Sequence, residues 1–257
     1  MDEERNSLKH LIHEQLLKED DGVYPDYWRG SSAGYCMRYN IFKRLHVPEV
    51  PEVVEGQSQR QGTLRIGHQV HALMQSLTKN AGLSVEQEAE LKSKEWDMVG
   101  HFDDLIKFPN GELVLYDYKT VHSQALKYPP ELKNTHRMQV GSYLYLLREK
   151  YPKLTKARIM EISKDDFLMR EIEFDWDDTL KSDLEAYWTE LNDWWAIYHE
   201  TGELPPCTCS ERLGAWFATR NKYGKVWNGY YFNEQPCSLA WFEQHRQLTN
   251  AEKEAMH

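Results

Sequence analysis

No stretch of the sequence approaches the roughly 20 consecutive apolar residues that a membrane-spanning helix needs. The chain starts with Met1, Asp2, Glu3 and Glu4, and no apolar segment follows, so we expect no secretory signal peptide. Cysteine is scarce, with four among 257 residues. These features predict a cytoplasmic protein without a membrane partner, whose cysteines are thiols or metal ligands rather than disulfides.

Positive charge is also in short supply. The chain carries 31 Lys and Arg against 41 Asp and Glu, a formal net charge of -10. Indiscriminate binding to nucleic acid depends on Lys and Arg at phosphates, so this balance disfavours it, while a local basic groove or a bound metal ion remains compatible with it. The sequence also contains no glycine-rich phosphate loop, nucleophile elbow or zinc-protease motif, and no internal repeat.

The chain does contain enough apolar material for one large domain, or for a core with an appended lobe, with 40% hydrophobic residues, nine Trp and 15 Tyr. Two short apolar runs flank a Pro-Asn-Gly turn signal at residues 109–111, and this pattern predicts a β-hairpin. The second run covers residues 113–119. Because side chains alternate between the faces of a strand, Asp117 and Lys119 leave this run on the same side.

The partner strand can bring a second carboxylate beside this pair. A two-residue Asn-Gly turn would place Asp104 opposite Asp117, whereas a three-residue loop or a bulge would place Asp103 there, and geometry alone leaves both registers open. Two carboxylates and a lysine around one point suit Mg²⁺, which takes oxygen ligands from carboxylates and substrate phosphate. The lysine can orient water or stabilise charge on the phosphate. Such a triplet is also typical of solvated charges at a strand end.

Hydrophobic periodicity predicts the remaining elements. Residues 48–61 are polar, with two Pro and one Gly, and indicate a loop. Residues 85–97 are expected to lead into the first hairpin strand, and strands are expected over 157–163 and 169–174. Helices are expected over 7–18, 33–45 with Ser31 and Ser32 as caps, 64–77, about 134–150 with Asn134 or Thr135 as cap, and about 178–200 with Gly202 as C-terminal cap.

Two of these helices carry pairs of residues four positions apart, which lie on one helix face. Gly67 and His71 form the first pair, and a glycine there permits close approach of backbone or ligand. Gln139 and Tyr143 form the second pair. Each is also compatible with ordinary packing, as a hydrogen-bonded core histidine or as the boundary of an amphipathic helix.

Together these pieces resemble the RecB-type nucleases of the PD-(D/E)xK superfamily, which include the exonucleases of CRISPR adaptation and many phage exonucleases. Their pattern is G-x-x-x-H on a helix, then G-x-x-D, then D-x-K, then Q-x-x-x-Y on a helix. The match covers about residues 64–147, and it selects Asp103 over Asp104. The matching pairs, in order, are Gly67 and His71, Gly100 and Asp103, Asp117 and Lys119, and Gln139 and Tyr143.

The resemblance implies an α/β fold with a central mixed β-sheet flanked by helices, and with N- and C-terminal helical segments joined by a cysteine site. It also implies metal-dependent hydrolysis of DNA phosphodiesters. Lys119 would orient or activate the water, while Gln139 and Tyr143 would contact DNA or steady Lys119. Glu86 or Glu88 would add a surrounding carboxylate. The implied ligands of Mg²⁺ or Mn²⁺ are His71, Asp103, Asp117 and the carbonyl of Tyr118.

Several members of this family hold a [4Fe–4S] cluster with one Cys before the nuclease core and three after it. Cys36, Cys207, Cys209 and Cys237 have that distribution. Their spacing departs from the family's C-x-x-C followed closely by a third Cys, because Cys207 and Cys209 are separated by one residue and Cys237 lies far downstream. The cluster is the favoured expectation, with structural zinc or unligated cysteines as alternatives.

The leading interpretation is therefore a metal-dependent DNA exonuclease of recombination, end resection or phage DNA metabolism, in a prokaryotic or phage-infected cell. Its expected partners are DNA with single-stranded or free ends and a recombination or replication protein. The alternatives are a structure-specific endonuclease or nickase, and a non-catalytic module that binds DNA ends or a partner. We expect a single nuclease domain over 1–257, with an N-terminal helical segment (1–60), a nuclease core (61–175) and a helical, cysteine-containing C-terminal lobe (176–257).

Overall fold

The computed structural model describes residues 8–18, 26–47, 54–209, 211–212, 239 and 242–243. Within these residues no helix has the length and apolar character needed to cross a membrane. The helices are α1 (Leu8–Lys18), α2 (Met37–Arg44), α3 (Val54–Asn80), α4 (Asn134–Lys150) and α5 (Asp178–Thr201), with 3₁₀ turns at Gly30–Ser32 and Ser123–Lys127. The strands are β1 (Trp28–Arg29), β2 (Ser84–Gln87), β3 (Glu90–Ser93), β4 (Met98–His101), β5 (Asp104–Lys107), β6 (Leu113–Val121), β7 (Lys156–Ser163) and β8 (Met169–Asp175).

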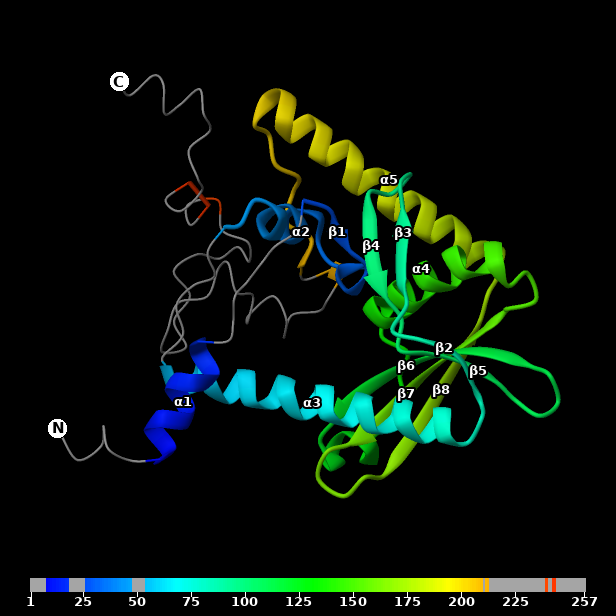
Figure 1. Ribbon diagram of the computed structural model, residues 1–257. Helices are drawn as coiled ribbons and strands as arrows, with labels where there is room; N and C mark the ends of the chain where they lie inside the picture. The colour runs from blue at the N-terminus through cyan, green and yellow to red at the C-terminus, as the bar shows by residue number, and fades with distance from the viewer. Residues whose placement is uncertain are drawn as a thin grey trace.

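Five strands form a mixed sheet in the order β2-β5-β6-β7-β8 (Figure 1). β6 and β7 pair in parallel, and the other neighbours are antiparallel. A parallel pair needs a crossover connection, and α4 lies between β6 and β7 in the chain. A second, smaller sheet has the order β1-β4-β3. The expected central mixed sheet flanked by helices is confirmed.

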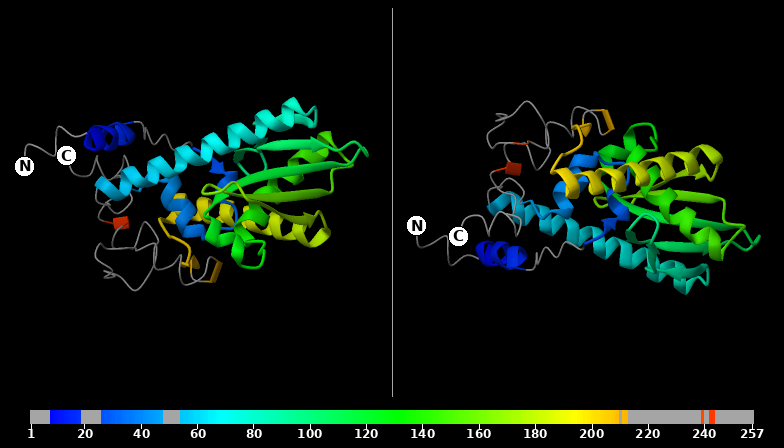
Figure 2. Two further views of the ribbon diagram at one scale, coloured as in Figure 1. Left: turned by 90° about the horizontal axis from the view of Figure 1, so that it is seen from below. Right: turned by 90° about the horizontal axis from the view of Figure 1, so that it is seen from above.

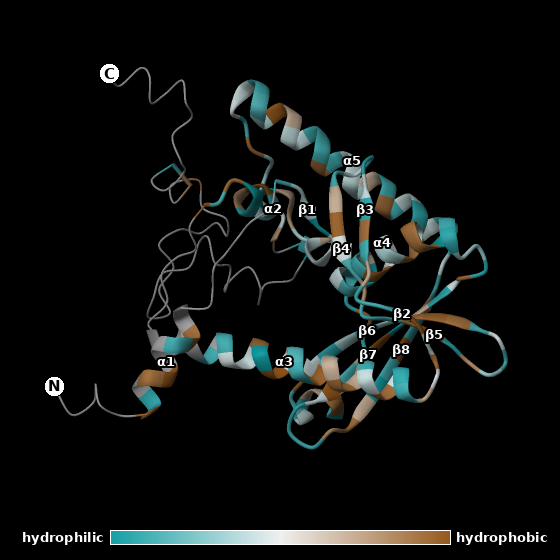
Figure 3. Cartoon of the chain, in the orientation of Figure 1, coloured by the Kyte–Doolittle hydropathy of each residue, from teal (hydrophilic) through white to brown (hydrophobic). Residues whose placement is uncertain are grey.

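Helices cover both faces of the five-stranded sheet. α3 lies on one side of it, and α4 and α5 lie on the other, in the view of Figure 1 and in the two views of Figure 2. β6 is buried on both faces, because Tyr116 and Tyr118 pack with Met74 of α3, whereas Leu115 packs with Leu144 of α4. The apolar colouring of the central strands in Figure 3 reflects this double burial.

A smaller apolar cluster joins the α2 region to two described residues after α5. Cys36, Tyr39 and Phe42 of the α2 region are buried together with Cys209 and Phe242. The Phe42 and Phe242 rings stack with centroids 5.0 Å apart. The N-terminal helical segment and the C-terminal part of the chain are therefore held against one another by apolar contacts.

The predicted loop at 48–61 is wrong for residues 54–61, because α3 begins at Val54 and runs for 27 residues. It thus crosses the boundary expected at residue 60. Gln and Arg favour helix more than Gly56 opposes it, and α1 packs along this part of α3, where Leu16 approaches Gly62. The rest of the predicted loop, 48–53, lies outside the described residues.

The predicted caps of two helices, and the predicted start of one of them, are also wrong. The helix expected from residue 33 begins instead at Met37, after the 3₁₀ turn, and the Ser32 hydroxyl donates to the carbonyl of Arg29 rather than capping it. At α4 the residue before the helix is Lys133, and it makes no side-chain cap. Residues 85–97 form parts of two strands rather than one run. The strands at β7 and β8 and the helix α5, with Gly202 at φ 75°, follow the sequence prediction.

Candidate active site

The length of the hairpin loop decides which carboxylate enters the site. The backbone N–H of Phe108 donates to the carbonyl of Glu112, so the loop holds the three residues 109–111. Gly111 adopts a φ of 87°, which favours glycine. The Asn110 side chain accepts from the N–H of Glu112 and stabilises the turn.

The three-residue loop sets a register in which Asp104 pairs with Tyr116. One residue further along, Asp103 faces Asp117. Asp104 turns to the opposite side of β5, since consecutive strand residues alternate. The structure therefore selects the register that the four-motif resemblance implied.

Asp117, Lys119, Gln139 and Tyr143 form one polar network between β6 and α4. Lys119 Nζ lies 2.8 Å from Asp117 Oδ2 and donates to Gln139 Oε1 at 3.2 Å. The Gln139 amide nitrogen lies 3.3 Å from Asp117 Oδ1 and 3.5 Å from the Tyr143 hydroxyl. Gln139 thus contacts both partners of the ion pair and restricts where Lys119 can point.

His71 and Asp103 approach the same region from α3 and from the residue before β5. His71 Nδ1 lies 3.4 Å from Asp103 Oδ1, and Asp103 Oδ2 accepts from the backbone N–H of Tyr118 at 2.6 Å. The His71 ring stands edge-on to the Tyr118 ring, with centroids 5.9 Å apart. The structure therefore brings the predicted site residues of α3, β6 and α4 into one neighbourhood.

The charges of this neighbourhood shift one another's pKa values. Burial raises the pKa of the Asp117 carboxyl, and the charge of Lys119 opposes this rise. Burial alone would lower the pKa of Lys119, but the negative charge of Asp117 opposes burial, and the pKa of Lys119 is raised. Burial likewise opposes the hydrogen bond and charge of Asp103 at His71, whose pKa is nonetheless raised.

The glycines of the first two motifs allow close packing. A Cβ on Gly100 would lie 2.4 Å from Cε1 of Tyr143, and one on Gly30 would lie 2.5 Å from the same atom. A Cβ on Gly67 would lie 3.3 Å from the Thr120 hydroxyl. Only a residue without a side chain lets the Tyr143 ring occupy this place.

Sequence reasoning does not identify two polar residues around the site, Asp104 and His136. Asp104 is fully buried and was considered only as an alternative to Asp103. His136, on the first turn of α4, has its pKa lowered to about 3 by burial and by the charges of Lys119 and Lys133. No motif marks either residue. Because Asp103 and Asp104 are consecutive where β5 begins, the sequence predicts that their carboxylates point to opposite sides, but it gives no partner for Asp104.

Glu86 and Glu88, the two candidates for a further carboxylate near the site, make different contacts. Glu86 pairs with Lys150 at 2.7 Å and accepts from the Tyr151 hydroxyl. Glu88 accepts from the side-chain amide of Gln75 at 2.6 Å, and the same amide nitrogen contacts the carbonyl of Asp103. Glu88 is therefore the one linked to a predicted ligand.

A cavity of about 400 Å³ lies beside the network. Its lining includes Gln139 and Tyr143, together with Arg29 and His101 from the small sheet. This space adjoins the polar network and is bordered by a guanidinium, so it has the size and charge to receive part of an anionic ligand.

The donor set fits a hard divalent cation by its chemistry, because carboxylates, a carbonyl and an imidazole are usual ligands of Mg²⁺ or Mn²⁺. Asp117 Oδ2 is buried, and its contact with Lys119 Nζ is ionic rather than a well-directed hydrogen bond. Among the described residues, three ligand atoms of His, Cys, Asp or Glu lie within 4.8 Å of one another only at the cysteines. His71, Asp103 and Asp117 therefore border a wider space than a closed metal cage.

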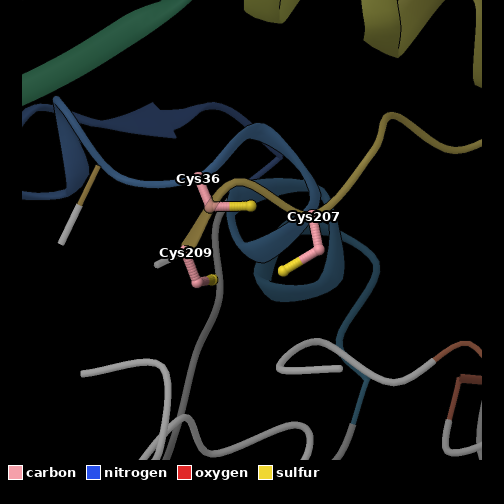
Figure 4. Close-up of side chains that lie close together, drawn as sticks. All are labelled: Cys36, Cys207 and Cys209. Atoms are coloured by element: carbon pink, nitrogen blue, oxygen red, sulfur yellow. The ribbon is translucent and has the colours of Figure 1, made fainter. Parts of the chain in front are cut away.

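Three of the predicted cluster ligands converge at a second place. The sulfur atoms of Cys36, Cys207 and Cys209 all lie within 4.8 Å of one another. Figure 4 shows them extending from the start of α2 and from the segment after α5 into a common space. The backbone N–H of Thr208 donates to Cys36 Sγ at 3.3 Å. These three thiols are suited to bind a metal, and Cys237 lies outside the described residues.

No family model and no curated protein matches the chain. Solved structures similar to it include an alkaline exonuclease from Laribacter hongkongensis, 11% identical, with 74% of this chain and 97% of that one covered and a TM-score of 0.46. The complex of that exonuclease with dAMP has a TM-score of 0.42 at 11% identity, with 72% of this chain and 98% of that one covered. A phage-related exonuclease from Haemophilus somnus 129PT is 11% identical and covers 55% and 73%, with a TM-score of 0.40. Phage-related and alkaline exonucleases are thus among the solved structures to which this chain is similar.

Proposed function

We propose that this protein is a metal-dependent deoxyribonuclease that hydrolyses phosphodiester bonds from DNA ends. One observation carries the proposal: Asp117 and Lys119, two residues apart on one strand, meet Asp103 across the hairpin and His71 from α3. An ion-binding or DNA-binding module does not need a lysine held between a buried carboxylate and an amide. A hydrolase has a use for it, because a positioned ammonium group can orient water and offset charge on a phosphate.

His71, Asp103, Asp117 and the Tyr118 carbonyl would hold Mg²⁺ or Mn²⁺. When bound, such an ion polarises a phosphoryl oxygen and lowers the pKa of water. Lys119 would hold the attacking water, whose oxygen forms the new bond to phosphorus as the bond to the departing ester oxygen breaks. Gln139 keeps Lys119 in place, and Arg29 would contact a phosphate in the adjoining cavity.

We further propose that Cys36, Cys207 and Cys209 bind a [4Fe–4S] cluster, with Cys237 as the fourth ligand. The closeness of three sulfurs from distant parts of the chain supports thiolate ligation. Structural zinc is the alternative with the same ligands. The biological setting proposed is recombination, end resection or phage DNA metabolism, with DNA carrying free or single-stranded ends as the substrate.

The deciding experiment incubates the anaerobically purified protein with end-labelled linear DNA and with circular DNA, in Mg²⁺, Mn²⁺ or chelator. Shortening of linear DNA alone, abolished by chelator, is expected for an exonuclease. Cleavage of circular DNA would contradict the exonuclease assignment and indicate an endonuclease. Metal-independent DNA binding without cleavage would indicate a non-catalytic binding module.

Lys119→Met tests the role of the lysine. Turnover should fall by on the order of 10²-fold or more, with little change in DNA affinity, because the charge acts on the reacting phosphate. Lys92→Met, which removes an exposed lysine of β3, is the matched control and should cleave normally. Normal turnover of Lys119→Met at saturating DNA would contradict the assigned role.

A further inference from the structure

Asp104 is a buried carboxylate outside the four motifs, and four side chains bond to it. It accepts from Thr78 Oγ1 at 2.5 Å and from Ser84 Oγ at 2.6 Å. It also accepts from Gln87 Nε2 at 3.0 Å and from the Tyr118 hydroxyl at 3.1 Å. A buried charge is costly unless it is hydrogen-bonded, and these donors offset that cost. The carboxylate therefore links α3, β2 and β6 at one point.

The link to α3 acts on the helix face that carries His71. Thr78 follows His71 by seven residues, close to two full turns, so both side chains lie on the same face. Gln75 lies between them on α3. Its side-chain amide donates to the backbone carbonyl of Asp103 at 3.3 Å, and its backbone carbonyl accepts from the side-chain amide of Gln87 at 2.8 Å. Apolar packing has little directional preference, whereas hydrogen bonds restrict both the rotation and the shift of a helix.

The link to β6 acts on the residue between Asp117 and Lys119. Tyr118 donates its backbone N–H to Asp103 and its hydroxyl to Asp104, so two consecutive carboxylates hold both ends of one residue. The Tyr118 ring in turn contacts the edge of the His71 ring. Asp104 thus reaches His71 by two routes, through Thr78 on α3 and through the ring of Tyr118.

We propose that Asp104 is a positioning residue of the candidate site, which fixes His71 relative to Asp103 through Thr78 and Tyr118. The proposal deepens the proposed function and rests on it for the identity of the site. If Asp104 had only a structural role, removing one of its hydrogen bonds would lower the stability of the protein and change nothing else. If Asp104 positions His71, removing the hydrogen bond also changes the environment of the His71 ring and weakens metal binding.

The test uses Thr78→Val, which keeps the shape of the side chain but removes the hydroxyl, and Thr78→Ser, which restores the hydroxyl. Ring resonances of labelled histidine are recorded without metal, and His71 is assigned with His71→Gln. Thr78→Val should shift the His71 resonance and weaken Mn²⁺ binding, measured by calorimetry, by roughly 10- to 100-fold, the usual effect of losing a partner behind a ligand. Thr78→Ser should return both towards wild type.

Ser84→Ala is the matched control, because it removes a hydroxyl from the same carboxylate on the β2 side. It should lower the melting temperature yet leave the His71 resonance and Mn²⁺ affinity unchanged. If Thr78→Val does not fold, Tyr118→Phe tests the second route with the same two measurements. A lower melting temperature with wild-type His71 resonance and Mn²⁺ affinity in Thr78→Val, or in Tyr118→Phe where that variant replaces it, would overturn the proposal. If the wild-type protein binds no Mn²⁺ and cuts no DNA, the proposed function fails, and the His71 resonance still decides whether Asp104 positions that ring.

Discussion

At the scale of single residues, the site depends on side chains that are absent as much as on those that are present. Tyr143 is buried to 2% exposure, and its ring packs against Gly30, in the 3₁₀ turn after β1, and Gly100, on β4. This packing places the Tyr143 hydroxyl 3.5 Å from the Gln139 amide. The glycine of the second motif therefore makes room for the tyrosine of the last motif, far along the chain.

Gly100→Ala tests this contact. The new methyl group would lie 2.4 Å from Tyr143 Cε1, so the free energy of unfolding should fall by about 1–3 kcal/mol, as in other overpacked cores. Urea denaturation measures the change. In a Tyr143→Leu background the same substitution should cost less, because the ring that it meets is gone.

Gly62→Ala is the matched control. A Cβ there would lie 3.8 Å from Leu16, an ordinary contact on a helix, so the protein should become more stable by up to about 1 kcal/mol. Equal effects of the two substitutions would show that Tyr143 does not press on Gly100.

At the scale of elements, α5 connects the small sheet with the helix layer of the site. Asn192 accepts from the indole of Trp28 at 2.7 Å, and the indole of Trp188 donates to Ser142 of α4 at 3.0 Å. The Tyr187 hydroxyl contacts the carbonyl of Ser32 at 3.2 Å. Any loosening of α5 therefore reaches both α4 and the segment before Cys36.

The stability of α5 depends on its first turn. Asp177 accepts from the backbone N–H of Leu180 at 2.6 Å, a side-chain N-cap. Asp177→Ala should lower the free energy of unfolding by about 1 kcal/mol, whereas Asp177→Asn retains an acceptor oxygen and should change it little. Chemical denaturation compares the three proteins. An equal loss in both variants would attribute the effect to charge rather than to capping.

The elements differ in how far the sequence predicts them. The hairpin, β7, β8 and α5 follow from short-range signals, namely the Pro-Asn-Gly turn, alternation and the capping glycine at Gly202. The start of α3 does not, because Gly56 and the preceding prolines indicate a loop and the contact with α1 is not visible in the local sequence. Asp104 could not be predicted as a buried hub, since its donors come from three elements that meet only in the folded chain.

At the scale of the whole molecule, the three cysteines join segments that are far apart in sequence. The apolar cluster around Phe42 and Phe242 surrounds the same junction. A metal bound there would stabilise the folded state directly and would close a very long loop, although the entropic gain grows only slowly with loop length.

Cys36→Ala tests this junction. The wild-type protein purified without oxygen should be brown and contain about four iron atoms per chain if the cluster is [4Fe–4S]. The variant should lose iron and melt at a lower temperature, while some nuclease activity survives in the cold. Metal analysis and thermal melting are the measurements, and Ser84→Ala, destabilised at β2, should keep its iron. A colourless protein that contains zinc would show that the cysteines bind structural zinc rather than an iron–sulfur cluster. A protein that contains neither metal would refute both metal assignments.

The cysteine junction also has a consequence for the order of events during synthesis. Thr208 contacts Cys36 across 172 positions of the chain. At roughly 5–20 residues per second, a ribosome needs on the order of ten to thirty seconds to cover that distance. The residues of the candidate nuclease site, between His71 and Tyr143, emerge well before then. Cys36 is therefore made well before the two cysteines that it meets, and a metal held by all three could bind only after Cys209 has emerged.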